Sequence, residues 1–119
     1  SAVQYFKVLY RVGVSVREMI GCCEKIGLQA IAVNVKMEDL RRMPLPSILY
    51  LKRGHFVVLD RIHQKRNKDY FRIIDPSRGR VKLQESFLCD DFLSDDYGVA
   101  IVLAPTEKFE KGDFVQGSL

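Results

Sequence analysis

The sequence GHFVVL at residues 54–59, read together with IIDP at residues 73–76, decides how this chain folds. Both runs are rich in β-forming residues, and the polar segment 63–69 lies between them, so they predict an antiparallel hairpin. With the loop centred near Lys65, His55 and Asp75 would face each other across the two strands, with Cβ atoms about 4.5–5.5 Å apart. We therefore expect both side chains on one edge of a sheet, within hydrogen-bonding reach.

A histidine beside a carboxylate has a simple chemical use. The carboxylate holds the imidazole in one tautomer and stabilises its cation, which supplies two of the three members of a catalytic triad. Each residue also has an ordinary structural interpretation. His55 fits a half-buried strand histidine, and Asp75 fits the start of an Asp-Pro turn. The pairing makes the functional interpretation harder to dismiss, and the residues alone leave both open.

Composition narrows the class of protein. The chain has 119 residues, enough for one compact domain, and its hydrophobic content of 47% is ordinary for a globular protein. Its longest apolar run, residues 99–104, is far shorter than the roughly 18 residues that span a bilayer. No signal peptide is recognisable at its start. A net charge of +4 is compatible with an acidic partner or a membrane surface and identifies neither.

Local signals place helices before a mainly antiparallel sheet, which is the α+β pattern. The clearest helix is residues 15–26, where Ser15 and Glu18 form a capping box and Gly27 follows as the terminating glycine. The other expected helices are residues 3–12, one or two turns within 37–42, and 85–92. The expected strands are residues 28–35, 47–52, 55–62, 70–75, 80–83 and 98–104.

The three cysteines do not indicate a site. Cys22 and Cys23 lie deep in the helix over residues 15–26, with Cys23 on its apolar stripe, whereas a catalytic thiolate favours a helix N-terminus. We expect Cys23 in the core, Cys22 at its margin and Cys89 as a packing residue, all as reduced thiols. No spacing of these cysteines with the histidines resembles a zinc site, so we expect no bound metal.

Basic residues gather at Lys65, Arg66 and Lys68. The simplest interpretation is a solvated loop. No aromatic platforms surround the cluster, so we expect no nucleic-acid partner.

Several short motifs, in order, resemble a known family. They are GVS at residues 13–15, EKIGL at 24–28, LPSIL at 45–49, GHFVVL at 54–59, DPSRG at 75–79 and GVA at 98–100. The series resembles the N-terminal cysteine peptidase domain of bacterial ABC exporters, the double-glycine leader peptidases, from about Gly13 to Phe109. The resemblance implies a papain-like α+β fold over residues 1–109, with residues 110–119 as a tail or linker.

The resemblance also implies roles for residues. His55 matches the general base of the family and Asp75 its orienting carboxylate. The family's nucleophile is a cysteine on an N-terminal helix, shortly after an oxyanion-hole glutamine. No cysteine precedes Gly13, and Gln4 is not followed by one at the required spacing. Without a thiol, the pair cannot form an acyl-enzyme, so we expect these 119 residues not to cleave a leader by themselves.

The function that the resemblance implies is recognition and cleavage of a double-glycine leader during bacteriocin or peptide export. The partners would be the leader-bearing cargo and the exporter's transmembrane and ATPase domains, with ATP bound by the ATPase domain and no cofactor here. The location would be the cytoplasmic face of the bacterial inner membrane. One alternative is a catalytically inactive peptidase-like domain that binds secretion substrate, as in toxin exporters. Another is a free-standing regulatory or adaptor domain unrelated to export.

Overall fold

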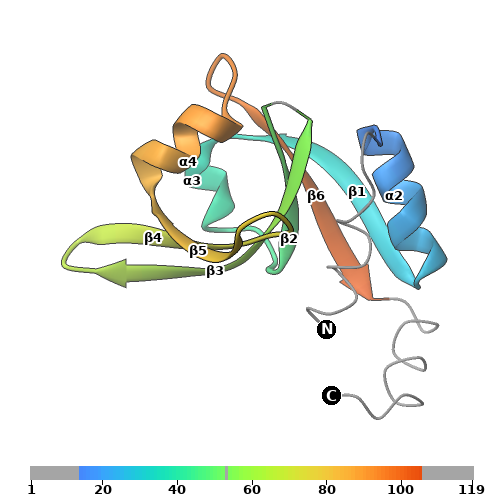
Figure 1. Ribbon diagram of the computed structural model, residues 1–119, viewed down its shortest axis with the longest axis horizontal. Coiled ribbons are helices and arrows are strands. Elements are labelled where there is room, and N and C mark those ends of the chain that lie inside the picture. The colour runs from blue at the N-terminus through green and yellow to red at the C-terminus, as the bar shows by residue number, and fades with distance from the viewer. Residues whose placement is uncertain (1–13, 53, 106–119) are drawn as a thin grey trace, which may run out of the picture.

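The computed structural model describes residues 14–52 and 54–105, which form one antiparallel sheet with helices on both faces (Figure 1). The strands of these residues follow the order β1-β6-β2-β3-β4-β5 across the sheet. In chain order the elements are α2 (Val16–Lys25), β1 (Leu28–Val35), α3 (Met37–Leu40), β2 (Ser47–Leu51), β3 (His55–Lys65), β4 (Lys68–Asp75), β5 (Gly79–Gln84), α4 (Glu85–Phe92) and β6 (Gly98–Pro105). The expected α+β class is confirmed. The helix expected at residues 3–12, Gln4 and the tail at 110–119 lie outside the described residues.

The helix α2 forms as its local signals predict. The Ser15 hydroxyl accepts the Glu18 N–H at 3.1 Å, and the Glu18 carboxylate accepts the Ser15 N–H at 3.0 Å. Gly27 has a φ of 90°, the left-handed conformation that ends a helix at low cost for glycine. In the described part of the chain, no helix is long and apolar enough to cross a membrane.

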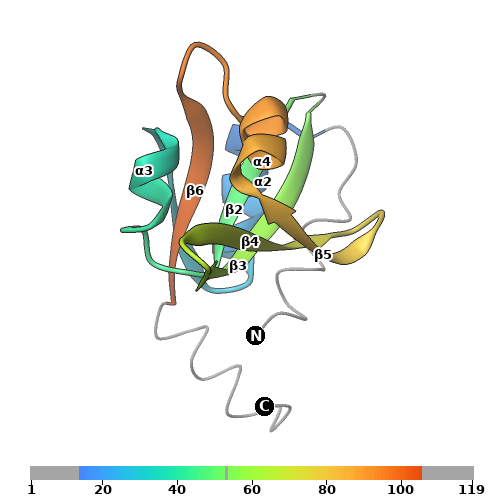
Figure 2. The same cartoon turned by 90° about the vertical axis from the view of Figure 1, so that its left-hand side faces the viewer.

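Two apolar clusters lie on opposite faces of the sheet, because successive strand side chains point to opposite sides. The α2 face carries Met19 and Cys23 against strand residues such as Phe56, Val58 and Ile74. The other face carries residues of α3 and α4 against Val57, Leu59 and Ile73. Figure 2 shows α4 in front of β2 and α2 behind it. By alternation from Val57 and Ile73, His55 and Asp75 both belong to the α4 face.

The hairpin of β3 and β4 is tighter than the sequence suggests. Segment 63–69, expected to be a loop, is mostly strand, and the turn is limited to Arg66 and Asn67. Both turn residues have positive φ, 53° and 64°, as in the two-residue turns that match the twist of a hairpin. The prediction was wrong here because the end of the hairpin is polar on both faces. The sequence therefore lacks the alternation of apolar and polar residues that indicates a strand.

A bulge at Asp60 also changes the register. Leu59 pairs with Ile73, but Arg61 pairs with Arg72, so β3 has one extra residue between them. The Asp60 carboxylate accepts a hydrogen bond from Arg72 Nε at 2.8 Å and another from Arg72 Nη2, which ties the bulge to the neighbouring strand.

The predicted direct opposition of His55 and Asp75 is therefore wrong. Val58 pairs with Ile74, so continuing the register sets Asp75 across from Val57, two residues from His55. His55 instead pairs with Leu51 of β2. The two side chains are diagonal neighbours on one face, which is still within reach of long side chains.

Candidate active site

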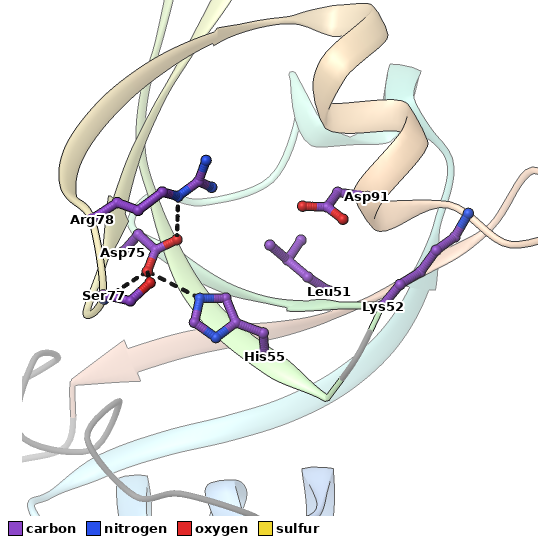
Figure 3. Close-up of a pocket in the computed structure, with 7 residues that line it drawn as sticks. All are labelled: Leu51, Lys52, His55, Asp75, Ser77, Arg78 and Asp91. Atoms are coloured by element: carbon purple, nitrogen blue, oxygen red, sulfur yellow. Dashed lines mark hydrogen bonds and ion pairs between the residues drawn. The ribbon is translucent and has the colours of Figure 1, made fainter.

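His55 and Asp75 meet at the edge of the sheet, as Figure 3 shows. His55 Nε2 lies 3.0 Å from Asp75 Oδ1, so the predicted hydrogen bond is confirmed. His55 stands at the first residue of β3 and Asp75 at the last residue of β4. Donation by the Nε2–H leaves the Nδ1 lone pair free to accept a proton.

Asp75 is 1% exposed, yet its carboxylate is well supplied with donors. Oδ1 also accepts the Ser77 N–H at 2.8 Å and the Ser77 hydroxyl at 2.7 Å, and Oδ2 accepts Arg78 Nε at 3.0 Å. Burial by itself would raise the pKa of Asp75. The hydrogen bonds from Ser77, His55 and Arg78 outweigh it and hold the pKa well below its usual range. Asp75 is therefore ionised at neutral pH and can accept a hydrogen bond from the His55 Nε2–H.

The turn after β4 builds this donor set. The Ser77 N–H bond closes an Asx-turn on Asp75, the Arg78 N–H donates to the Asp75 carbonyl at 3.2 Å, and Gly79 supplies the positive φ of 80° that starts β5. Asp75 is thus a turn residue and a partner of His55 together. Neither Ser77 nor Arg78 was predicted from the sequence to have a role. The Asp-Pro-Ser order, which is typical of an Asx-turn, was the signal that could have found Ser77.

The pair opens into a hollow of about 430 Å³ between the sheet and α4. His55 remains 38% exposed there, so a bound molecule can reach its imidazole. Figure 3 shows Asp75, Ser77 and Arg78 on one side of the hollow, and Lys52 and Asp91 on the other. The lining residues are Leu51, Lys52, His55, Asp75, Ser77, Arg78 and Asp91.

The cysteines lie away from this lining. Cys23 packs in the α2 cluster and Cys22 at its margin, both on the opposite face from His55, while Cys89 packs against the other cluster. All three are free thiols, and the predicted positions of Cys22 and Cys23 are confirmed. Across residues 14–52 and 54–105, no group of three His, Cys, Asp or Glu side chains could hold a metal ion.

The two helix cysteines should differ in reactivity. Cys23 is fully buried, and burial with the nearby Cys22 and Glu24 raises its pKa to about 12. We expect an alkylating reagent to label Cys22 in the native protein and Cys23 only after unfolding, as read by mass spectrometry of the resulting peptides. Native labelling of Cys23 as fast as that of Cys22 would contradict its core position.

The depressed pKa of Asp75 also predicts how stability depends on pH. Its ordinary pKa is about 3.8 and its pKa in the folded chain is lower, so the ionised carboxylate stabilises the folded state above the ordinary value. That stability is lost as pH falls toward the lower value. At neutral pH, Asp75→Asn should unfold with about 1–3 kcal/mol less free energy than wild type. The gap in Tm should narrow below about pH 4, as calorimetry would measure. A gap independent of pH would show that Asp75 is not ionised in the folded protein.

The fold is that of a papain-like α+β peptidase domain. The chain belongs to the Peptidase C39 family, which it matches over residues 6–108. The resemblance inferred from the ordered motifs is therefore confirmed.

Two curated relatives are from Escherichia coli. The chain is 29% identical over 97 residues to the probable microcin-H47 secretion/processing ATP-binding protein MchF. It is 29% identical over 98 residues to the colicin V secretion/processing ATP-binding protein CvaB. Each match covers 82% of this chain but 13% of the relative, so the chain spans a small part of these proteins.

Solved structures share the fold. A double glycine motif protease from an AMS/PCAT transporter, in complex with the leader peptide, has a TM-score of 0.68 and 26% identity, covering 79% of this chain and 62% of that one. The N-terminal peptidase C39-like domain of a toxin secretion ATP-binding protein from Vibrio parahaemolyticus has a TM-score of 0.66 and 16% identity, covering 89% and 94%. The peptidase domain of Streptococcus mutans ComA has a TM-score of 0.61 and 21% identity, covering 80% and 78%. At these lower identities the last two show the fold alone.

Proposed function

We propose that this domain recognises a double-glycine leader on an exported peptide and that His55 is the general base in its cleavage. The observation that carries the proposal is the His55–Asp75 hydrogen bond beside an open hollow, with Asp75 held ionised. The matched protease bound to the leader peptide supports this choice of substrate.

The proposed reaction has a defined order of proton transfers. His55 Nδ1 takes the proton of a cysteine thiol, and Asp75 stabilises the imidazolium that results. The thiolate attacks the scissile carbonyl carbon, and the imidazolium then gives its proton to the leaving amine. Water hydrolyses the acyl-enzyme with His55 again as base. The thiol would not come from Cys22, Cys23 or Cys89, since none of these residues lines the hollow.

The surroundings of the domain are part of the proposal. The names of MchF and CvaB describe secretion and processing with ATP binding. We infer the same setting here: an exporter whose transmembrane and ATPase domains are partners, ATP in the ATPase domain, and a position at the cytoplasmic face of the bacterial inner membrane.

The test separates recognition from chemistry. The 119-residue chain is mixed with a double-glycine leader peptide, with chemical-shift changes reporting binding and mass spectrometry reporting cleavage. We expect shifts at His55, Ser77 and Arg78 and no cleavage. A scrambled peptide is the control. Equal shifts with both peptides, or none with several leaders, would remove the support for leader recognition at this hollow.

A second candidate function is binding of secretion substrate without cleavage. The absence of a cysteine from the lining of the described hollow favours it. An assay of leader cleavage and leader binding with the longest natural form of the protein decides between the two functions. Cleavage that requires His55 means a peptidase, and binding without cleavage means a peptidase-like docking domain.

A further inference from the structure

The hairpin of β3 and β4 carries cations on one face and not on the other. On the α4 face, Asp69 forms an ion pair with Arg41, the C-cap residue of α3. Glu85 Oε1 accepts a hydrogen bond from Arg41 Nη2 at 2.9 Å. On the opposite face, Arg61 pairs in register with Arg72, and Arg72 pairs with Lys82 of β5. Three cations therefore stand in one cross-strand row.

Such a row is unfavourable by itself, because like charges directly opposite each other destabilise a sheet. Asp60 compensates Arg72. Arg61 and Lys82 are exposed, and neither forms an ion pair with any residue that the structure describes. Nearer the tip, a second pair of cations stands in register, with Lys65 opposite Lys68. An anionic partner would remove this repulsion.

The same face is hollowed. A depression of about 510 Å³ lies among the side chains of the hairpin and β5, lined by His63, Gln64, Lys65, Arg66, Tyr70 and Lys82. Ammonium, guanidinium, amide and phenol groups are donors suited to phosphate oxygens. The phenol of Tyr70 and the imidazole of His63 are the two aromatic rings in this lining, so the depression offers neither an apolar groove for a peptide helix nor a row of stacking platforms for nucleic acid.

The position of this face suits a broad anionic surface. Figure 1 shows the hairpin extending away from the body of the domain, at the end opposite α2. The side of the hairpin opposite the α4 face is its outer face. Cations on the outer face and at the tip can approach a flat surface together. Each Lys or Arg near an anionic bilayer strengthens binding about fivefold.

We propose that the outer face of the β3–β5 ribbon, defined by Arg61, Lys65, Arg66, Arg72 and Lys82, binds the phosphate headgroups of an anionic phospholipid bilayer. The inference rests on the proposed function for the nearness of a bilayer alone. It would hold the hollow at His55 at a set distance from the membrane surface.

The test is co-sedimentation of the 119-residue chain with vesicles that contain no leader peptide. Vesicles of equimolar phosphatidylcholine and phosphatidylglycerol should bind it, vesicles of phosphatidylcholine alone should not, and added salt should release it. Lys65→Gln combined with Lys82→Gln should weaken binding about 25-fold. The matched control, Arg17→Gln with Arg42→Gln, changes net charge equally at exposed sites elsewhere and should bind as wild type.

Four outcomes would contradict the proposal. Equal binding to both vesicles excludes headgroup recognition, and equal weakening by both double variants shows an effect of net charge alone. Release by inorganic phosphate at constant ionic strength indicates a free-phosphate site, and binding to polyglutamate without vesicle binding indicates an acidic protein segment. His55→Ala should leave vesicle binding unchanged, so failure of the peptidase proposal and failure of this one are separately visible. The comparison of the two kinds of vesicle uses the wild-type chain, so it can be made whether or not a variant folds.

Discussion

His55→Ala is expected to lower kcat/KM for leader cleavage by about 10⁴-fold in the longest natural form of the protein, with little change in leader binding. The hydrogen bond from Nε2 to Asp75 leaves Nδ1 as the proton acceptor, and alanine offers no substitute. Asp75→Asn should also lose much of the rate, because an amide cannot stabilise the imidazolium as a carboxylate does. Single-turnover cleavage followed by mass spectrometry measures the chemical step.

Two controls make this expectation specific. Arg42→Ala changes an exposed residue in the turn after α3 and should cleave at the wild-type rate. Cys22→Ala and Cys89→Ala should also retain activity, because neither cysteine lines the hollow. Full cleavage by His55→Ala, or loss of cleavage in either cysteine variant, would mean that the proposed base or the proposed source of the thiol is wrong.

Gly98→Ala and Gly21→Ala are expected to change the free energy of unfolding in opposite directions. A Cβ at Gly98 would lie 2.5–2.7 Å from three ring atoms of Phe92, which is buried at the end of α4. The ring would have to move within a packed core, at a cost of about 1–3 kcal/mol. A Cβ at Gly21 of α2 meets nothing within 4 Å, so alanine should stabilise the helix by about 1 kcal/mol.

Denaturant unfolding of the two variants and wild type tests both signs in one experiment. The two substitutions add the same methyl group, so the comparison isolates the surroundings of each glycine. Equal effects would mean that the close approach of Phe92 to Gly98 does not constrain the fold. Since α4 contributes Asp91 to the hollow, leader binding by Gly98→Ala would show how far this packing supports the site.

Local signals in the sequence predicted the elements that depend on local interactions. The capping box at Ser15 and Glu18 is confirmed, and so are the helix over residues 85–92 and the strand over 28–35. Local signals could not predict the order of the strands. The strand β6 lies between β1 and β2 through long-range pairing, which leaves no local pattern in the sequence.

The candidate site was predicted in part for a similar reason. Hairpin logic brought His55 and Asp75 to one face, and their hydrogen bond is confirmed. Direct opposition failed because it needed the turn position and the bulge, and neither has a clear signal: the turn is Arg66-Asn67 and the bulged residue is an ordinary Asp60. Their catalytic roles stay a prediction until activity is measured.

The bulge has a consequence for which insertions and deletions the segment between His55 and Asp75 can accept. If the turn stayed at Arg66-Asn67 and Asp60 were paired like its neighbours, Asp75 would lie across from Val58. In the bulged hairpin the Val58 side chain points to the α2 face. His55 and Asp75 would then be on opposite sides of the sheet. Deletion of Asp60 itself would leave Leu59 opposite Ile73 in a regular ladder, so it should preserve the pair. Loss of one residue elsewhere in the hairpin, with the bulge kept, should separate the pair. An odd change in the length of this hairpin is therefore expected to come with the loss or gain of a bulge wherever the pair functions.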